Sequence, residues 1–212
     1  MSGETIRRGK FISLEGGEGA GKSTQAQALA EVLRSRGLDV VVTREPGGSE
    51  GAEAIRELLL SGADDRWSAP AEALLFAAAR ADHVDHIIRP ALRGGQWVVS
   101  DRFVDSSLAY QGGAGGLGID AVRAINGCAI GDCCPDRTLV LALAEGGARA
   151  RARDNEHSDR IGGRPEGYHQ KVDLAFRQIA AEEAARVRLV DASGDPAEVT
   201  MRLLSELADL LP

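Results

Sequence analysis

One short stretch limits what this chain can fold into more than any other. Residues 16–24 read GGEGAGKST, which fits the pattern GxxxxGK[ST] of a phosphate-binding loop. An apolar run over residues 11–14 precedes this stretch, and an amphipathic run over residues 22–36 begins inside it. Such a loop requires a strand before it and a helix after it, and both flanks agree. The alternative is a glycine-rich turn that joins a strand to a helix and binds nothing.

Each residue type in this loop has a chemical reason to be there. Glycine lets successive backbone N–H groups curl around an anion, at the positive end of the helix that begins near Lys22. We expect Lys22 to reach the β- and γ-phosphates of a nucleotide and Ser23 to hold a magnesium ion. The residues predicted to hold the nucleotide are Gly16, Gly17, Glu18, Gly19, Ala20, Gly21, Lys22, Ser23 and Thr24.

Length and composition favour one domain over residues 1–212. A chain of 212 residues is ordinary for an α/β domain, and no apolar run approaches the roughly 18 residues that span a bilayer. The first residues carry charge without an apolar segment, so we expect a cytoplasmic protein with no membrane partner. The net charge of −7 argues against binding duplex nucleic acid across the whole surface. Three cysteines, Cys128, Cys133 and Cys134, are too few and too close for a disulfide framework and lack zinc-ligand spacing.

Apolar runs of strand length alternate with longer helical patterns along the chain, with glycine and proline between them. This alternation predicts an α/β fold of the P-loop NTPase type, in which helices flank a five-stranded parallel sheet. The predicted strands are 11–15, 38–43, 96–100, 138–143 and 187–191. The predicted helices are 22–36, 52–60, 69–92, 119–129, 145–153, 167–186 and 196–211.

Two stretches have too much glycine, proline and charge for regular structure, and we expect both to be mobile. Residues 44–51 follow the second predicted strand, so they should border the same crevice as the phosphate loop, at the carboxyl ends of the strands. Residues 153–167 lie between two predicted helices. They are interpreted as a lid that closes over phosphates, with an ordinary surface loop as the alternative.

The third predicted strand runs into Ser100, Asp101 and Arg102. An acidic residue at the tip of a buried strand beside a phosphate loop is well placed to orient magnesium, so Asp101 joins Ser23 as a predicted metal ligand. Arg102 would then face a phosphate. Elsewhere in a protein, an Asp-Arg pair is more often a surface ion pair or a helix cap.

Two further segments predict the walls of a polar pocket. Ser107, Tyr110 and Gln111 are spaced three or four residues apart and can share a helical face, although helix capping would also explain a serine there. Phe76 and Arg80 lie four residues apart in a helical pattern. Aromatic residues are only 4% of the chain, so Phe76 is a candidate platform for a nucleobase, against the default of an ordinary core residue.

Arginine is concentrated late in the chain. A solvated helix face is the usual meaning of such a run, but guanidinium groups on a segment that can close also suit the neutralisation of charge during phosphoryl transfer. The residues concerned are Arg149, Arg151, Arg153, Arg160 and Arg164.

Taken together, these segments resemble the bacterial thymidylate kinases from about Phe11 to the last predicted helix. The resemblance rests on the phosphate loop and on five further motifs. TREPGG and DSSLAYQG, in this order, are nearly diagnostic. The motifs are TREPGG at 43–48, LLFAAAR at 74–80, SDRFVDSSLAYQGG at 100–113, PDRTLVL at 135–141 and SDRI at 158–161.

The resemblance implies an enzyme that transfers the γ-phosphoryl group of Mg-ATP to dTMP, giving dTDP and ADP, and that works as a homodimer, with 69–92 as a candidate surface. Phe76 would stack on thymine, Arg80 would bond its carbonyl group, and Tyr110 would favour deoxyribose. The residues that it implies for dTMP are Glu18, Glu45, Arg56, Phe76, Arg80, Arg102, Ser107, Tyr110 and Gln111. Those that it implies for catalysis are Glu18, Lys22, Arg102, Arg153 and Arg160.

The position of one arginine separates two styles within this family. Gly19, not an arginine, follows Glu18, so the resemblance places the catalytic arginine in the lid, at Arg160 and its neighbours. We expect Arg160→Ala to lower kcat far more than it raises KM for dTMP. The chain departs from the usual family pattern at Ala142 and Gly162, where an acidic residue is common.

Two other functions remain open at this point. Another P-loop kinase of nucleoside monophosphates or small metabolites would share the phosphate loop and differ in the pocket around Phe76 and Gln111. A P-loop switch protein would use the nucleotide to control a partner, but the chain has no NKxD-like guanine motif. A panel of monophosphate substrates distinguishes the first alternative from a dTMP kinase, and negligible turnover would favour the second alternative.

Overall fold

The computed structural model describes residues 8–63, 65–143 and 159–212. Its centre is one five-stranded sheet in which every neighbouring pair of strands is parallel, in the order β2-β3-β1-β4-β5. This confirms the predicted α/β class and the predicted five strands. The strands are β1 Phe11–Glu15, β2 Val40–Arg44, β3 Trp97–Asp101, β4 Arg137–Ala142 and β5 Val187–Asp191.

The central strand β1 has both faces covered, and all five of its side chains are buried. Ile12 lies beside Val99 of β3 on one side and Arg137 of β4 on the other. Because all strands run the same way, the loops that follow β1, β2 and β3 meet at one edge of the sheet, where ligands bind in open α/β folds.

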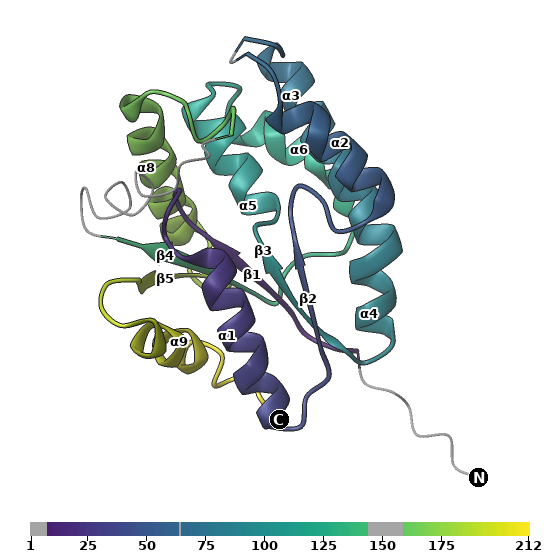
Figure 1. Ribbon diagram of the computed structural model, residues 1–212, viewed down its shortest axis with the longest axis vertical. Coiled ribbons are helices and arrows are strands. Elements are labelled where there is room, and N and C mark those ends of the chain that lie inside the picture. The colour runs from purple at the N-terminus through teal and green to yellow at the C-terminus, as the bar shows by residue number, and fades with distance from the viewer. Residues whose placement is uncertain (1–7, 64, 144–158) are drawn as a thin grey trace.

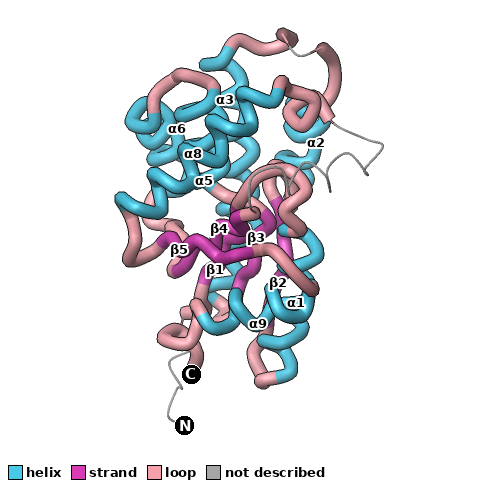
Figure 2. The backbone as a smooth tube through the Cα atoms, turned by 90° about the vertical axis from the view of Figure 1, so that its left-hand side faces the viewer, coloured by secondary structure: helices cyan, strands magenta, loops and turns pink. Residues whose placement is uncertain are grey.

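Helices cover both faces of the sheet (Figure 1). Helices α1 and α9 lie on one face, and α3, α5, α6 and α8 lie on the other, as the side view in Figure 2 shows. The α-helices are α1 Lys22–Ser35, α2 Glu50–Leu60, α3 Ala69–His83, α4 Arg89–Arg93, α5 Val104–Ser107, α6 Ile119–Ile130, α8 Glu166–Glu182 and α9 Pro196–Ser205. Two π-helical turns, η1 Val84–Ile88 and η2 Leu108–Ala114, continue α3 and α5. Within the described ranges, no helix has the length and apolar character needed to cross a membrane.

Apolar side chains form a core on each face. Leu29 and Leu33 of α1 pack with Leu203 of α9 against the sheet, and all three are fully buried. On the opposite face, Val172 and Phe176 of α8 pack with η2 and α6. These cores hold the sheet rigid beneath the loops that carry the site.

Two helices begin at residues whose side chains cap the helix N-terminus. Ser68 caps α3 by accepting a hydrogen bond from Ala71 N, and Asp195 caps α9 by accepting one from Ala197 N at 2.8 Å. Helix α1 is different, because its N-cap is Gly21 and no side chain caps it. The amide groups at the start of α1 therefore remain available to an anion.

The structure differs from the predictions in several places, including the ends of the last two helices, since α8 ends at Glu182 and α9 at Ser205 rather than at 186 and 211. The predicted helix 69–92 is interrupted by η1, and residues 104–114, which were not among the predicted helices, are helical, as the suggested helical face of Ser107, Tyr110 and Gln111 requires. Residues 45–49 form the predicted irregular loop, but α2 begins at Glu50, inside the stretch 44–51 that was expected to be mobile. The predicted helix 145–153 lies outside the described residues.

Candidate active site

The phosphate loop has the backbone geometry that its glycines predict. Gly16 adopts a φ of 131°, and a Cβ there would lie 2.5 Å from Leu141 O, so only glycine fits. Gly21 also has a positive φ, of 87°, directly before α1. Lys22 is buried and its Nζ donates a hydrogen bond to Gly17 O at 2.7 Å. The lysine thus folds back across the loop whose amide groups would face a bound anion.

Ser23 and Asp101 meet where α1 begins and β3 ends. The Ser23 hydroxyl donates a hydrogen bond to Asp101 Oδ2. Asp101 Oδ1 is buried and has no hydrogen-bond partner in the described part of the chain. A hydroxyl and a carboxylate with an unused oxygen form the hard, all-oxygen donor set that Mg²⁺ prefers. The two residues therefore fit the metal that was predicted for them.

Glu18 and Arg102 form an ion pair at the centre of the site. Arg102 Nη2 lies 2.5 Å from Glu18 Oε1, and Tyr110 Oη donates to the same oxygen at 3.0 Å. The Arg102 guanidinium, together with Lys22 and against the effect of burial, lowers the pKa of Glu18 to about 2. Burial disfavours the charge on Arg102, but Glu18 together with Tyr110, Asp101 and Glu15 outweighs it and raises the pKa of Arg102. Both side chains are therefore charged at any pH at which an enzyme works.

Arg102 is held in a backbone conformation that few residues adopt. Among the non-glycine residues of the described ranges, Arg102 alone has a positive φ, of 70°. Its Nη1 donates to Ser106 Oγ at 3.1 Å, and the Ser106 hydroxyl donates to Glu15 Oε2 at 2.5 Å. Glu15 Oε1 accepts from Phe103 N at 2.8 Å. Burial, with Asp105 nearby, raises the pKa of Glu15 to about 8. Glu15 thus anchors the turn that carries Arg102.

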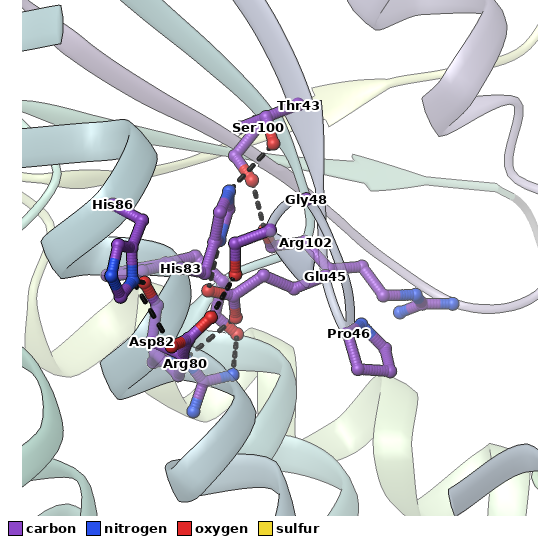
Figure 3. Close-up of polar contacts among 12 residues, drawn as sticks. Thr43, Glu45, Pro46, Gly48, Arg80, Asp82, His83, His86, Ser100 and Arg102 are labelled. Carbon is purple, nitrogen blue, oxygen red and sulfur yellow. Dashed lines mark hydrogen bonds and ion pairs between the residues drawn. The ribbon is translucent and has the colours of Figure 1, made fainter. Parts of the chain in front are cut away.

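A second group of charges is buried behind the loop that follows β2 (Figure 3). Arg80 Nε donates to Glu45 Oε2 at 2.7 Å, and both side chains are almost completely buried. Glu45 Oε1 accepts from His83 Nδ1 at 3.0 Å, and His83 Nε2 lies 2.7 Å from Thr43 Oγ1. Residues from β2, the following loop and α3 are thereby tied into one chain of contacts that ends at Arg80.

Three more acceptors fix the plane of the Arg80 guanidinium. Its Nη1 donates to Ser107 Oγ at 3.0 Å and to Asn126 Oδ1, and its Nη2 donates to Phe103 O at 3.1 Å. The guanidinium carbon lies 5.3 Å from the centre of the Phe103 ring. With so many partners, Arg80 is a preorganised donor at the wall of the pocket.

One cavity of about 500 Å³ joins the phosphate loop to these groups. That volume is in the usual range for a small-molecule site. The predicted site residues that line it are Glu18, Gly19, Gly21, Lys22, Ser23, Thr24, Glu45, Arg56, Phe76, Arg80, Asp101, Arg102, Ser107, Tyr110 and Gln111. Arg44 and Pro46 also line it, as expected for the loop 44–51, and so do residues that were not proposed for the site: Leu60, Phe103, Ser106, Asp159 and Ile161.

Other predicted residues do not line the cavity. Arg160 is buried, with its guanidinium against the Glu72 carboxylate and its Nε donating to Leu59 O at 2.8 Å. These contacts join Arg160 to α2 and α3. Arg153 lies outside the described residues. Roles for both arginines in the transfer step remain predictions.

Four buried polar residues behind the cavity were missed from the sequence. They are Glu15, Glu72, His83 and Asn126. A signal for one of them was present, because Glu72, Phe76 and Arg80 are spaced four residues apart and therefore share one face of α3.

Comparison with known proteins agrees with the geometry. A protein-family model described as thymidylate kinase matches residues 14–203. The chain is 61% identical over 206 residues to a thymidylate kinase of Rhizorhabdus wittichii, covering 96% of this chain and 99% of that relative. It is 48% identical over 212 residues to one from Afipia carboxidovorans, covering 97% and 93% of the two chains.

A crystal structure of thymidylate kinase from Ehrlichia chaffeensis superposes with a TM-score of 0.77 at 30% identity. The match covers 94% of this chain and 98% of that one. With the family model and near-full-length relatives in agreement, this chain belongs to the thymidylate kinase family.

Proposed function

We infer that this chain transfers the γ-phosphoryl group of ATP to dTMP, giving dTDP and ADP, in the cavity described above. The observation that carries this inference is that a single cavity is lined both by the phosphate loop and by Phe76, Arg80 and Gln111. A kinase that phosphorylates a nucleotide must bind two nucleotides end to end, and such a cavity offers a place for each. Arg102, which also lines the cavity, would lie where the two nucleotides meet.

On the ATP side, the amide groups of the loop and Lys22 would bind the β- and γ-phosphates. Magnesium would be held by Ser23 and Asp101, whose free Oδ1 supports this assignment. When bound, it would neutralise part of the charge on the phosphates. Glu18 would lie close to the acceptor, since it already pairs with Arg102.

On the acceptor side, Phe76 is half-buried and lines the cavity, which suits stacking on a base. Arg80 would donate a hydrogen bond to the base, and Arg102 would bind the acceptor phosphate. Arg56 is held near it by a hydrogen bond from its Nη1 to Pro46 O at 2.6 Å. Burial, followed by repulsion from Arg44, lowers the pKa of Arg56, so an added phosphate there would relieve an unfavourable charge.

The chemistry requires positive charge more than it requires a base. The nucleophile is a phosphate oxygen, already largely ionised near neutral pH because the second pKa of a phosphate monoester is about 6. The barrier comes from bringing two polyanions together and from the charge on the transferring group. Lys22 and Arg102 enter the cavity from different elements, so they can act on both partners.

A coupled assay of ADP release tests this function. ATP and magnesium would be supplied with dTMP, dCMP, AMP or GMP in turn, and the expected result is turnover with dTMP far above the others. Lys22→Ala should lose nearly all activity. If wild-type protein forms no ADP with dTMP, the proposed function is wrong.

We also infer that the enzyme is a homodimer. This inference is supported by Leu58 of α2 and Leu74 of α3, which are 41% and 57% exposed on neighbouring helices. Large exposed apolar side chains on adjacent elements are typical of subunit interfaces.

A further inference from the structure

Glu72 is a buried carboxylate that none of the proposed steps uses. It lies on α3, is 2% exposed, and contacts two parts of the chain that are distant in sequence. Its Oε1 accepts a hydrogen bond from Gln111 Nε2 at 3.0 Å. Its Oε2 accepts from Arg164 Nη2 at 2.6 Å and from Arg160 Nη2. One oxygen therefore faces the pocket wall and the other faces the segment 159–165.

The contact with Gln111 fixes which end of the Gln111 amide faces the cavity. An ionised carboxylate accepts hydrogen bonds and cannot donate them, so the NH₂ group of Gln111 must point toward Glu72. Gln111 is only 3% exposed and lines the cavity. Its Oε1 has no hydrogen-bond partner in the described ranges, so the amide presents an acceptor to a ligand.

We propose that Glu72 is a positioning residue for substrate selection: it holds the Gln111 amide with its oxygen toward the nucleobase, and it thereby favours bases whose edge carries a ring N–H. This proposal rests on the proposed function, since it concerns the base of the acceptor nucleotide. The two arginines hold Glu72 in place from the other side.

The chemistry of the bases gives the proposal its consequence. Thymine and uracil carry an N–H between two carbonyl groups, and this N–H can donate to an amide oxygen. Cytosine has an unprotonated ring nitrogen at the same place, so an amide oxygen there meets a lone pair. A buried site built to pair with one group rejects an analogue that lacks it, because its own polar atoms are then left without partners.

Replacing Glu72 by glutamine should reverse the Gln111 amide. The two guanidinium groups can only donate, so they would take the oxygen of the new side chain. Its NH₂ group would then face Gln111, which must turn its own oxygen away from the base. The volume of the side chain hardly changes, so this variant alters hydrogen-bond direction more than packing.

The experiment measures kcat/KM for dTMP, dUMP and dCMP with wild type and Glu72→Gln. We expect the ratio of dTMP to dCMP to fall by about tenfold or more, the effect of one buried hydrogen bond that is lost or opposed. The ratio of dTMP to dUMP should not change, because these two bases share the same ring N–H. An equal loss with all three substrates, or an unchanged ratio of dTMP to dCMP, would overturn the proposal.

Two controls separate this role from a general effect on the fold. Arg164→Gln removes one cation from Oε2 and leaves the Gln111 contact, so its ratio of dTMP to dCMP should match wild type. In a Gln111→Leu background, Glu72→Gln should produce no further change in that ratio. A further change there would show that Glu72 acts by another route. Wild-type turnover of dTMP tests the proposed function separately.

A spectroscopic measurement applies even if Glu72→Gln fails to fold. The side-chain NH₂ signals of Gln111 can be assigned in ¹⁵N-labelled wild-type protein by their loss in Gln111→Leu. They should move little when dTMP binds, because the NH₂ group keeps Glu72 as its partner. A large shift, as expected if the NH₂ group turned to the base, would contradict the proposal.

Discussion

Lys22 keeps its ammonium group buried, with Nζ bonded to Gly17 O. Burial, followed by repulsion from Arg102, lowers the pKa of Lys22 from 10.5 to about 8. The charge that the proposed reaction needs is therefore unfavourable in the free protein. ATP phosphates would remove this disadvantage, so the site is strained until its ligand binds.

Lys22→Met should make the free protein more stable while abolishing phosphoryl transfer. The pKa shift corresponds to about 3 kcal/mol, and loss of the hydrogen bond to Gly17 O offsets about 1 kcal/mol of it, leaving a gain of about 2 kcal/mol. Below pH 8 the lysine is charged in both states, so the whole cost is present. Between pH 8 and 10.5 the folded state loses the proton first, and the cost disappears. Urea unfolding of the variant and the wild type, at pH 7 and above pH 10.5, measures the difference in free energy of unfolding at each pH.

The expected result is that the free energy of unfolding of Lys22→Met exceeds that of wild type by a large amount at pH 7 and by a small amount at the higher pH. If Lys22→Met is less stable than wild type at pH 7, then the free-energy cost of burying the ammonium group is smaller than its lowered pKa indicates.

Ser106→Ala should weaken dTMP binding without unfolding the protein. The Ser106 hydroxyl joins Arg102 to Glu15, so its loss removes one of the hydrogen bonds that position the Arg102 guanidinium, which keeps its contacts with Glu18 and with Gly16 O. A hydrogen bond to a charged group contributes about 1.5–3 kcal/mol, which predicts a rise in KM for dTMP of at least about tenfold. Steady-state kinetics with varied dTMP and then varied ATP checks this. KM for ATP should change little.

Ser35→Ala is the control for this variant, because its hydroxyl is exposed and bonds only to Val32 O within α1. It should match wild type with both substrates. Equal changes in KM for dTMP and ATP in Ser106→Ala would argue against a specific role for the hydroxyl at Arg102.

At the scale of the element, the sequence predicted regular structure best where periodicity was strong. Strands β1 and β5 have the predicted ends, and α1 begins at the predicted Lys22. A shared helical face was suggested for Ser107, Tyr110 and Gln111, but the stretch 104–114 was not assigned as a helix because its glycines weaken a helical pattern, and contacts with α8 and α6 stabilise it. The π-helical turn η1 depends on tertiary packing, which a local sequence pattern does not predict.

Gly48→Ala tests the loop that joins β2 to α2. Gly48 has a φ of 92°, and a Cβ there would lie 2.5 Å from His83 Nε2 and 2.6 Å from Thr43 Oγ1. The added methyl group would displace the His83 ring, and through it Glu45. We expect a loss of about 3 kcal/mol in the free energy of unfolding, from crowding and the disfavoured φ together. KM for dTMP should rise as well.

Gly127→Ala is the matched control, since Gly127 lies on an exposed face of α6 with nothing within 4 Å of an added Cβ. It should stabilise the protein by about 0.5–1 kcal/mol, because alanine is the better helix former. If Gly48→Ala is equally stabilising, the close approach to His83 has no energetic consequence.

At the scale of the whole molecule, the site is assembled by the sheet and not by any one segment. The order β2-β3-β1-β4-β5 brings the phosphate loop next to Asp101 and Arg102, which lie some 80 residues later in the chain. Motifs could predict which residues gather there. They could not predict that Glu72 would face Arg164, 92 positions away, because such pairs depend on how α3 packs against the segment before α8 on one face of the sheet.

The proposed homodimer can be tested with two exposed leucines on different helices. Leu74 of α3 is 57% exposed and Leu174 of α8 is 66% exposed, so glutamate at either position is tolerated by the monomer. Burying a carboxylate in an apolar interface is costly, so Leu74→Glu should raise the dissociation constant of the dimer by at least about 100-fold. Leu174→Glu should leave it unchanged. Sedimentation velocity over a range of protein concentrations measures both. A monomeric wild type would contradict the proposed homodimer. Each substitution alters exposed surface only on its own helix, so dissociation by Leu174→Glu alone would show that α3 does not form the interface.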